Sequence, residues 1–347
     1  MVKNYFDQKI NFSSKIISEI SRPFLLAEVA MSHEGKIDKV KYMIDKSVEA
    51  GFDGIQFQLF KFKNLLTPSH KYYSTGIKCE IPYSDWKTLF KYASKKGLIV
   101  SSNILESSAL KPSIQFGSDL LKIHSSDIAN PTFIKNISKT KLPVILATGG
   151  SKLSEIKDAI NLFKRYECKK LILMHGYQGY PTPINKSNLN LITKLKEEFN
   201  MLVGFQDHVN AEDVMSNILP MIALSKGASI IEKHITDNRS RKGTDYISSL
   251  DPLEFKHFVS IFKKTYSAMG HKKIGKLSKS ELQYRKDFKK TIIASKNIKK
   301  NDLLTMKNLT FMRGNEMGYP PSFIDNVINK KARLNLNKYD VIKKKHF

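Results

Sequence analysis

Short apolar segments alternate with longer amphipathic segments along most of the chain. Segments that are apolar at consecutive positions are typical of strands covered by helices on both faces, as in a parallel sheet. The pattern predicts eight such strands, at residues 24–30, 54–58, 98–102, 119–124, 143–148, 171–175, 201–205 and 229–234.

The segments between these strands predict an outer ring of helices. Val40, Met43 and Ile44 recur at helical spacing, and the stretch 156–163 repeats the pattern. Strands and helices that alternate eight times indicate the α/β class. They fit a (β/α)8 TIM barrel over residues 15–275 better than an open, doubly wound sheet.

The character of the sequence changes toward the carboxyl end. Residues 276–289 are charged and helix-forming, which predicts a linker. Residues 290–347 hold short β-like runs broken by turn-forming residues, which predicts a small β-rich domain. So short a domain buries little area alone, and we expect it to pack on a partner surface.

Composition supports a large globular core. The chain has 347 residues, of which 41% are hydrophobic and 10% aromatic. No apolar run is long enough to cross a membrane, and the first fifteen residues lack the apolar region of a signal peptide, so we expect a cytoplasmic protein. Cys79 and Cys168 lie far apart, which predicts two reduced thiols and no disulfide framework.

The net charge of +26 raises the possibility of a nucleic-acid partner. Almost all of the positive charge is lysine, and the seven arginines that could make bidentate contacts with phosphate are scattered. We therefore expect neither a nucleic-acid nor a membrane partner. The basic surface would instead attract small anionic substrates.

Two histidines at the ends of successive predicted strands are the best metal-ligand candidates. His208 closes the run Val-Gly-Phe-Gln-Asp-His, and His234 closes the run Ile-Ile-Glu-Lys-His. The carboxyl ends of barrel strands meet at one mouth, where these imidazoles could share a divalent ion. A structural role for either histidine alone is the competing interpretation.

Other polar residues follow the predicted strands. Glu28 could anchor sugar hydroxyls or transfer protons, and Lys122 with the segment 123–131 could bind an anion and activate water. A two-glycine turn after Thr148 could hold a phosphate at a helix N-terminus. Segments containing Tyr180 and Asp245 are equally consistent with ordinary loops when taken singly.

Taken together and in this order, these segments resemble the sialic acid synthase family, which makes nonulosonic acids. The resemblance covers most of the chain, and the tail resembles the antifreeze-like (SAF) domain that ends this family. It implies that phosphoenolpyruvate condenses with an N-acylated hexosamine of the N-acetylmannosamine type. The C3 carbon of the donor attacks the open-chain sugar aldehyde, water adds at C2, and phosphate is released.

The resemblance also implies roles for particular residues. Mn²⁺ or Mg²⁺ would bind the positions of His208 and His234 and polarise the aldehyde. Family members form dimers in which the tail of one subunit caps the barrel of the other, so a domain-swapped homodimer is expected. The implied catalytic residues are Glu28, Lys122 and Asp127, and the implied substrate-binding residues are Gln58, Ser102, Ser125, Thr148, Tyr180, Asp245 and Arg313.

Several positions depart from the family pattern, and the departures cluster around the donor. Gln56 replaces a usual lysine, while Ala147 and Gln206 replace usual serines. An amide does not replace a charge-assisted hydrogen bond to a carboxylate or phosphate. These changes leave open a divergent enzyme that uses phosphoenolpyruvate weakly or takes another donor, and a non-catalytic sugar-binding relative.

Overall fold

The chain divides into two compact units, Met1–Gly270 and His271–Phe347, in a computed structural model. The structure describes residues 4–12, 14–270 and 275–347. The expected ranges of 15–275 for the barrel, 276–289 for the linker and 290–347 for the last domain stay predictions. The segment expected to be a linker contains a regular helix, α11 (Lys279–Phe288), which begins with a capping box at Ser278 and Glu281.

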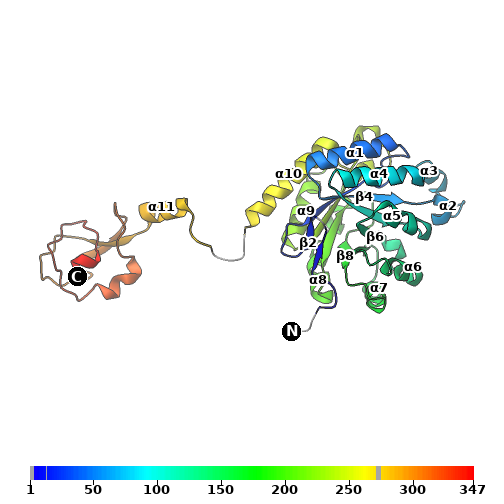
Figure 1. Ribbon diagram of the computed structural model, residues 1–347. Helices are drawn as coiled ribbons and strands as arrows, with labels where there is room; N and C mark the ends of the chain where they lie inside the picture. The colour runs from blue at the N-terminus through cyan, green and yellow to red at the C-terminus, as the bar shows by residue number, and fades with distance from the viewer. Residues whose placement is uncertain (1–3, 13, 271–274) are drawn as a thin grey trace. The chain divides into compact units, whose positions relative to one another are not determined.

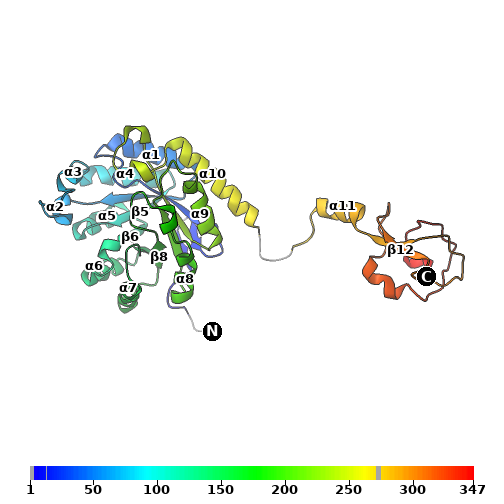
Figure 2. The same ribbon diagram turned by 180° about the vertical axis from the view of Figure 1, so that it is seen from behind.

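The first unit is a closed barrel of eight parallel strands, so the predicted TIM barrel is confirmed (Figures 1 and 2). The eighth strand pairs with the first, with His234 opposite Glu28, and this pairing closes the barrel. The strands are β3 (Phe24–Glu28), β4 (Gly54–Leu59), β5 (Ile99–Ile104), β6 (Leu120–Ile123), β7 (Val144–Ala147), β8 (Leu171–His175), β9 (Val203–Asp207) and β10 (Ile230–His234).

Helices surround this barrel. The apolar face predicted for the first helix is confirmed, since Val40, Met43 and Ile44 are buried. The helices are α1 (Ile37–Ala50), α2 (Phe62–Leu65), α3 (Tyr73–Ile77), α4 (Tyr83–Lys95), α5 (Leu110–Phe116), α6 (Pro131–Ser138), α7 (Leu153–Arg165), α8 (Asn190–Phe199), α9 (Met215–Ser225) and α10 (Pro252–Met269).

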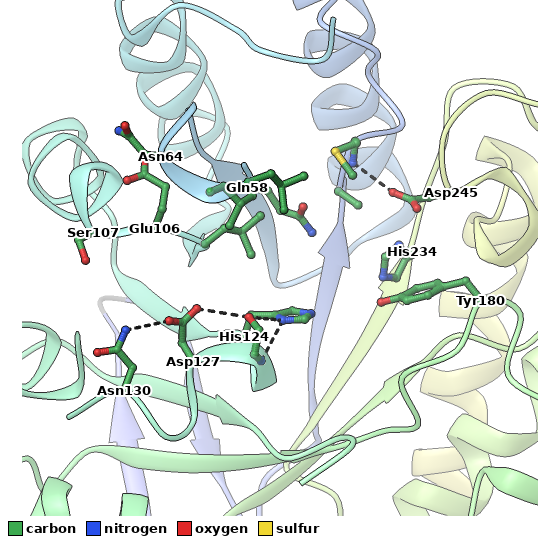
Figure 3. A pocket seen from close by; sticks show the side chains of 16 residues that line it. Gln58, Asn64, Glu106, Ser107, His124, Asp127, Asn130, Tyr180, His234 and Asp245 are labelled. Atoms are coloured by element: carbon green, nitrogen blue, oxygen red, sulfur yellow. Dashed lines mark hydrogen bonds between the residues drawn. The ribbon is translucent and has the colours of Figure 1, made fainter. Parts of the chain in front are cut away.

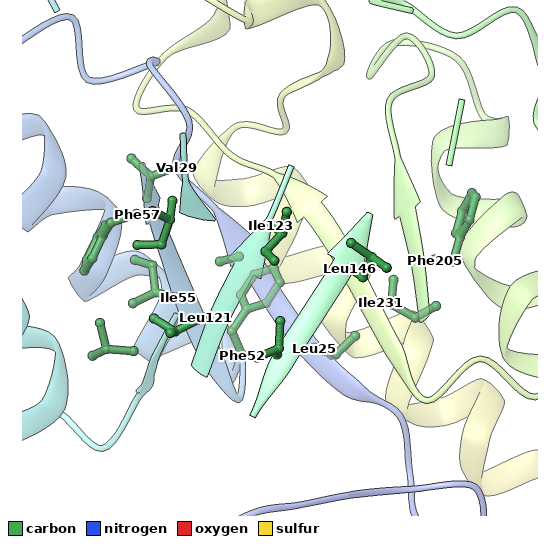
Figure 4. Close-up of a cluster of buried hydrophobic side chains, with 14 of the residues drawn as sticks. Leu25, Val29, Phe52, Ile55, Phe57, Leu121, Ile123, Leu146, Phe205 and Ile231 are labelled. Atoms are coloured by element: carbon green, nitrogen blue, oxygen red, sulfur yellow. The ribbon is translucent and has the colours of Figure 1, made fainter. Parts of the chain in front are cut away.

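Apolar residues at alternate strand positions belong to two separate cores. One set, which includes Leu25, Phe57 and Leu146, packs outward against the helices (Figure 4). The other set, which includes Phe24 and Ile145, fills the barrel interior. This period of two decides which side chains at the strand ends can reach the barrel mouth.

A short hairpin covers the amino-terminal end of the barrel. Strand β1 (Lys9–Asn11) pairs antiparallel with β2 (Ile16–Ser18). Ile10 and Ile17 are buried in the same interior core as Phe24 and Leu202. The sequence pattern did not predict this hairpin, because three-residue strands are too short to show a period of two. It seals the end of the barrel opposite the mouth.

The second unit is built around β11 (Thr291–Ala294) and β12 (Leu309–Met312), which pair antiparallel. Its small core includes Ile292, Ile298 and Leu336. The expectation of a β-rich domain at this end is therefore confirmed, although much of the unit consists of isolated bridges and turns.

The described residues contain no helix both long and apolar enough to cross a bilayer. Cys79 and Cys168 are both buried and unpaired with each other. The expectation of two free thiols is confirmed.

Candidate metal centre and substrate cavity

The inward-facing positions of the strands change from apolar to polar toward the carboxyl ends. In β10, Ile230 lies in the interior core, whereas Glu232 and His234, two and four residues later, line a cavity at the mouth. In β6, Leu120 is followed in the same way by Lys122. Because these ends converge on one face, a buried polar cluster forms there.

His208 and His234 lie next to each other at this mouth. Their ring centroids are 5.0 Å apart and both side chains are buried. The Nδ1 atom of His208 lies 3.0 Å from the carbonyl oxygen of Tyr177, which can only accept, so this nitrogen carries the proton. The Nε2 lone pair is therefore free to bind a metal, and Tyr180 Oη lies 3.3 Å from it.

Burial keeps both imidazoles neutral. It lowers the pKa of His208 to about 4, and it lowers the pKa of His234 well below its ordinary value, with a further contribution from the neighbouring His208. Neutral imidazole is the form that binds metal ions. The Nδ1 atom of His234 is buried and has no hydrogen-bond partner among the described residues, as expected of an imidazole that is prepared for a ligand.

Glu232 completes a possible set of three metal ligands. One ligand atom from each of His208, Glu232 and His234 lies within 4.8 Å of the others, and all three residues are buried. Two nitrogens and a carboxylate oxygen are a ligand set typical of catalytic divalent metal sites with an open position. The residues present therefore fit the expected divalent ion, while its identity stays a prediction.

Lys122 crosses the barrel mouth to reach the same carboxylate. Its ammonium donates to both oxygens of Glu232, at 2.6 Å each, and both side chains are buried. Gln56 donates its amide to Glu28 and, at 3.1 Å, to Glu232, and its oxygen accepts from Ser101 at 2.9 Å. The side chain of Gln56 is therefore fully hydrogen-bonded within the protein. Among the described residues that line the small cavity at the mouth, Lys122 is the sole lysine or arginine.

Glu28 is a buried carboxyl that favours its protonated form. It accepts from Gln56, from Gln58 at 3.1 Å and from the backbone amide of Ala30 at 2.7 Å. Burial raises its pKa to about 8, the nearby Glu232 adds to the rise, and Lys122 opposes it. A carboxyl that titrates near neutrality is suited to proton transfer.

This shift predicts how stability depends on pH. The folded chain binds the Glu28 proton more tightly than the unfolded chain, so its stabilising contribution is full below about pH 4.5 and is lost as pH rises through about 8. We expect E28Q, without metal, to lose less stability than the metal-free wild type between pH 5 and pH 9. Denaturant unfolding at several pH values measures this, and equal pH slopes for the two proteins would contradict it.

Two adjoining cavities form the site. The inner cavity is lined by Glu28, Lys122 and the two histidines, and its volume of about 20 Å³ is room for about one water molecule. The outer cavity has a volume of about 580 Å³, which suits a sugar-sized ligand (Figure 3). The residues that line both are Gln58, His124, Tyr180 and His234.

Several predicted site residues line the outer cavity. Tyr180 lies beside His208 and His234, with ring centroids 4.4 and 5.8 Å away. Asp127 accepts from the Asn130 amide at 3.0 Å and lines the cavity on the opposite side (Figure 3). Asp245 accepts from the Met31 amide at 3.3 Å, and burial raises the pKa of its carboxyl.

Two amide donors in the cavity are left free by the protein. Gln178 Nε2 and Gln206 Nε2 are buried and have no hydrogen-bond partner among the described residues. Glycines make room for both side chains, because a Cβ atom at Gly176 would clash with Gln206 and one at Gly149 would clash with Gln178. The Oδ1 atom of Asn103 is likewise buried and unpaired within the described chain.

The structure does not bring every predicted residue to the site. Ser102 occupies an outward-facing position of β5, and its Oγ pairs with Ser118 Oγ at 2.5 Å. Thr148 follows the end of β7, and its Oγ1 donates to the Met174 carbonyl at 3.1 Å. Ser125 begins the 3-10 turn Ser125–Asp127 and is half-buried, whereas the next residue, Ser126, lines the outer cavity. Neither Ser102 nor Thr148 is among the residues that line the two cavities, and their roles toward the substrate stay predictions.

Arg313 belongs to the second unit. It is exposed, and its guanidinium lies 5.3 Å from the centre of the Phe288 ring. Its role toward the sugar stays a prediction.

The residues that sequence reasoning missed share one signal. Glu232 lies two positions before His234, and Asn103 lies two positions after Ser101, so each shares the inward face of its strand with a second polar residue. A period of two applied backward from His234 would have selected Glu232.

Comparison with known proteins gives consistent matches across both units. Residues 43–274 match the NeuB family and residues 289–347 match the SAF domain. An uncharacterised protein of Methanocaldococcus jannaschii is 29% identical over 96% of this chain and 97% of its own length. The N,N'-diacetyllegionaminic acid synthase of Campylobacter jejuni is 29% identical over 85% of this chain and 91% of its own.

A solved structure shows the same similarity. The N-acetylneuraminic acid synthetase of Leptospira borgpetersenii, crystallised with citrate, is 27% identical and superposes with a TM-score of 0.73. The match covers 80% of this chain and 96% of that one.

Proposed function

Because this chain belongs to the NeuB family and ends in a SAF domain, we propose that it is a nonulosonic acid synthase that condenses phosphoenolpyruvate with an N-acylated hexosamine. The observation that carries the proposal is the buried set of His208, Glu232 and His234 beside a sugar-sized cavity. A Mn²⁺ or Mg²⁺ ion bound there would supply a Lewis acid for the sugar aldehyde.

The protein's own residues account for the remaining tasks. Lys122 offers the positive charge that an anionic donor needs, since its ammonium lies at the inner cavity and is held in place by Glu232. Asp127, oriented by Asn130, would accept the proton of the attacking water. Tyr180 and Asp245 line the outer cavity, where they would position the sugar hydroxyls.

Glu28 would serve the acceptor side of the reaction. Glu28 accepts a hydrogen bond from the side-chain amide of Gln58, and Gln58 lines the outer cavity. With a pKa of about 8, Glu28 can hold or release a proton near neutral pH, which suits a group that exchanges a proton with the sugar oxygen.

The donor side supports a divergent enzyme as the second candidate. Gln56, where a lysine is usual, is fully occupied by Glu28, Glu232 and Ser101 and offers no charge to a phosphate. The free amides of Gln178 and Gln206 can donate to an anion, but neutral donors bind it less strongly than an ammonium does. Weak use of phosphoenolpyruvate, or use of a related donor, is therefore the alternative to ordinary turnover.

Metal removal tests the proposal. We expect the purified protein to release phosphate from phosphoenolpyruvate when Mn²⁺ and an N-acylated hexosamine are both present. Chelation should abolish this release, and added Mn²⁺ should restore it. Ordinary turnover would exclude the altered-donor alternative, whereas no release with any acceptor would reject phosphoenolpyruvate as the donor.

We also propose that the protein forms a homodimer in which the tail of one subunit reaches the barrel of the other. A cytoplasmic location is part of the same proposal. Sedimentation of the intact protein would measure the oligomeric state.

A further inference from the structure

A third cavity, lined mainly by apolar side chains, adjoins the outer cavity. Its volume is about 520 Å³, and its walls include Phe62, Leu65 and Leu66 from the α2 region and Cys79 just after α3. Phe62 and Cys79 are buried in a small hydrophobic cluster that is separate from the two barrel cores. We define these walls and the space they enclose as the apolar cavity.

The apolar cavity is continuous with the site. Four half-buried apolar residues line both it and the outer cavity, namely Met31, Leu65, Leu66 and Leu105. Tyr180 and Asp245 also line both. A ligand in the outer cavity therefore meets polar groups such as His234 and Asp127 and apolar groups such as Leu65 and Leu66.

Asp245 lies at the junction of the two cavities. Its Oδ2 atom accepts from the Met31 amide, which fixes the carboxyl there, and the second oxygen can accept from a ligand. The amide N–H of an acyl-amino group is a donor of the right kind for this oxygen. An acyl chain attached to that amide would then point into the apolar cavity.

We propose that the apolar cavity binds the acyl chain of the acceptor, and that the preferred acceptor is a hexosamine whose N-acyl chain is longer than acetyl. A single methyl group would leave most of about 520 Å³ unfilled. Apolar side chains that remain in contact with water beside a bound substrate are unfavourable in free energy. Each methylene group that covers them therefore strengthens binding. This inference rests on the proposed function, in which the acceptor is an N-acylated hexosamine, and it specifies the acyl group of that acceptor.

Calorimetric titration of the Mn²⁺-loaded protein with N-acylmannosamines tests the inference without requiring turnover. Each buried methylene should tighten binding about fourfold, so the N-butanoyl sugar should bind about 15-fold more tightly than the N-acetyl sugar. The N-hexanoyl sugar should bind at least as tightly as the N-butanoyl sugar. Equal dissociation constants along the series, or no binding of any member, would overturn the inference.

A cavity-filling variant locates the effect. We expect L66W to remove most of the difference between the N-acetyl and N-butanoyl sugars, because the indole would occupy the apolar cavity. The matched control is L153W, at an exposed position of α7, which should keep the wild-type ratio. A wild-type ratio in folded L66W would contradict the assignment of the cavity.

Phosphate release by the same samples separates this inference from the proposed function. Turnover with the N-acetyl sugar and no gain from longer chains would leave the synthase activity in place and reject the acyl-chain site. Tighter binding of longer chains without phosphate release would reject the activity and support the site.

Discussion

Replacing His234 with glutamine is expected to lower kcat/KM for phosphate release by about a thousandfold. The buried Nδ1 atom of His234 has no hydrogen-bond partner in the described part of the chain, and one ligand atom from each of His208, Glu232 and His234 lies within 4.8 Å of the others. Loss of the ion's electrostatic stabilisation costs several kcal/mol, and each 1.4 kcal/mol is tenfold in rate. Mn²⁺ affinity, measured by calorimetry, should fall together with the rate.

His175 provides the matched control. It also ends a barrel strand, but it occupies an outward position, where its Nε2 atom lies 2.9 Å from the Ser187 carbonyl oxygen. A glutamine amide can make the same hydrogen bond, so H175Q should keep both Mn²⁺ affinity and activity. Retention of both properties in H234Q would reject the metal centre.

Replacing Lys233 with methionine is expected to cost about 3–5 kcal/mol of the free energy of unfolding. The Lys233 ammonium is fully buried between the sheet and the helices, 2.5 Å from Asp207 and 2.9 Å from the carbonyl oxygen of Ser216. Without the ammonium, the Asp207 carboxylate is buried and unpaired, which is the costly state. Fluorescence of the single tryptophan, Trp86, which is buried in the core between the strands and the helices, measures the unfolding.

A second substitution tests the cause. In the double variant D207N/K233M neither charge remains, and asparagine can still accept from the Val209 amide as Asp207 does. We expect this variant to regain most of the lost stability. The exposed pair of Lys194 and Glu198 is the control, since K194M should leave the unfolding free energy unchanged within error. A double variant as unstable as K233M would show that the ion pair is not the reason.

The ion pair of Asp207 and Lys233 also lies next to the candidate metal centre. Asp207 and Lys233 each precede a metal-ligand candidate on neighbouring strands, and they face outward while His208 and His234 face inward. The pair therefore holds β9 and β10 together at the residues that set the distance between the two imidazoles.

The sequence predicted the barrel well because strands buried on both faces are continuous apolar runs. All eight predicted segments coincide with strands of the closed barrel. Because both faces of these strands are buried, the pattern does not distinguish inward-facing from outward-facing positions. The sequence therefore could not show whether Ser102 or Asn103 faces the mouth. Ser102 pairs with Ser118 on the outer face, and Asn103 lines the cavity.

Contacts across the barrel also lay beyond sequence reasoning. The sequence marks Lys122 as an unusual lysine at a strand end, but its partner Glu232 is 110 positions away and is reached only when β10 closes against β3. The apolar cavity is a similar case, because its walls come from separate loops and short helices that no single periodic pattern links.

The sequence by itself determined the architecture, the carboxyl-terminal domain and the positions of His208 and His234, because hydrophobic periodicity and strand ends are local properties of the chain. Only the tertiary structure decided which polar side chains share the mouth, which charges pair inside it and what shape the adjoining space has. Those outcomes depend on the register of neighbouring strands and on closure of the barrel, which join residues far apart in the chain.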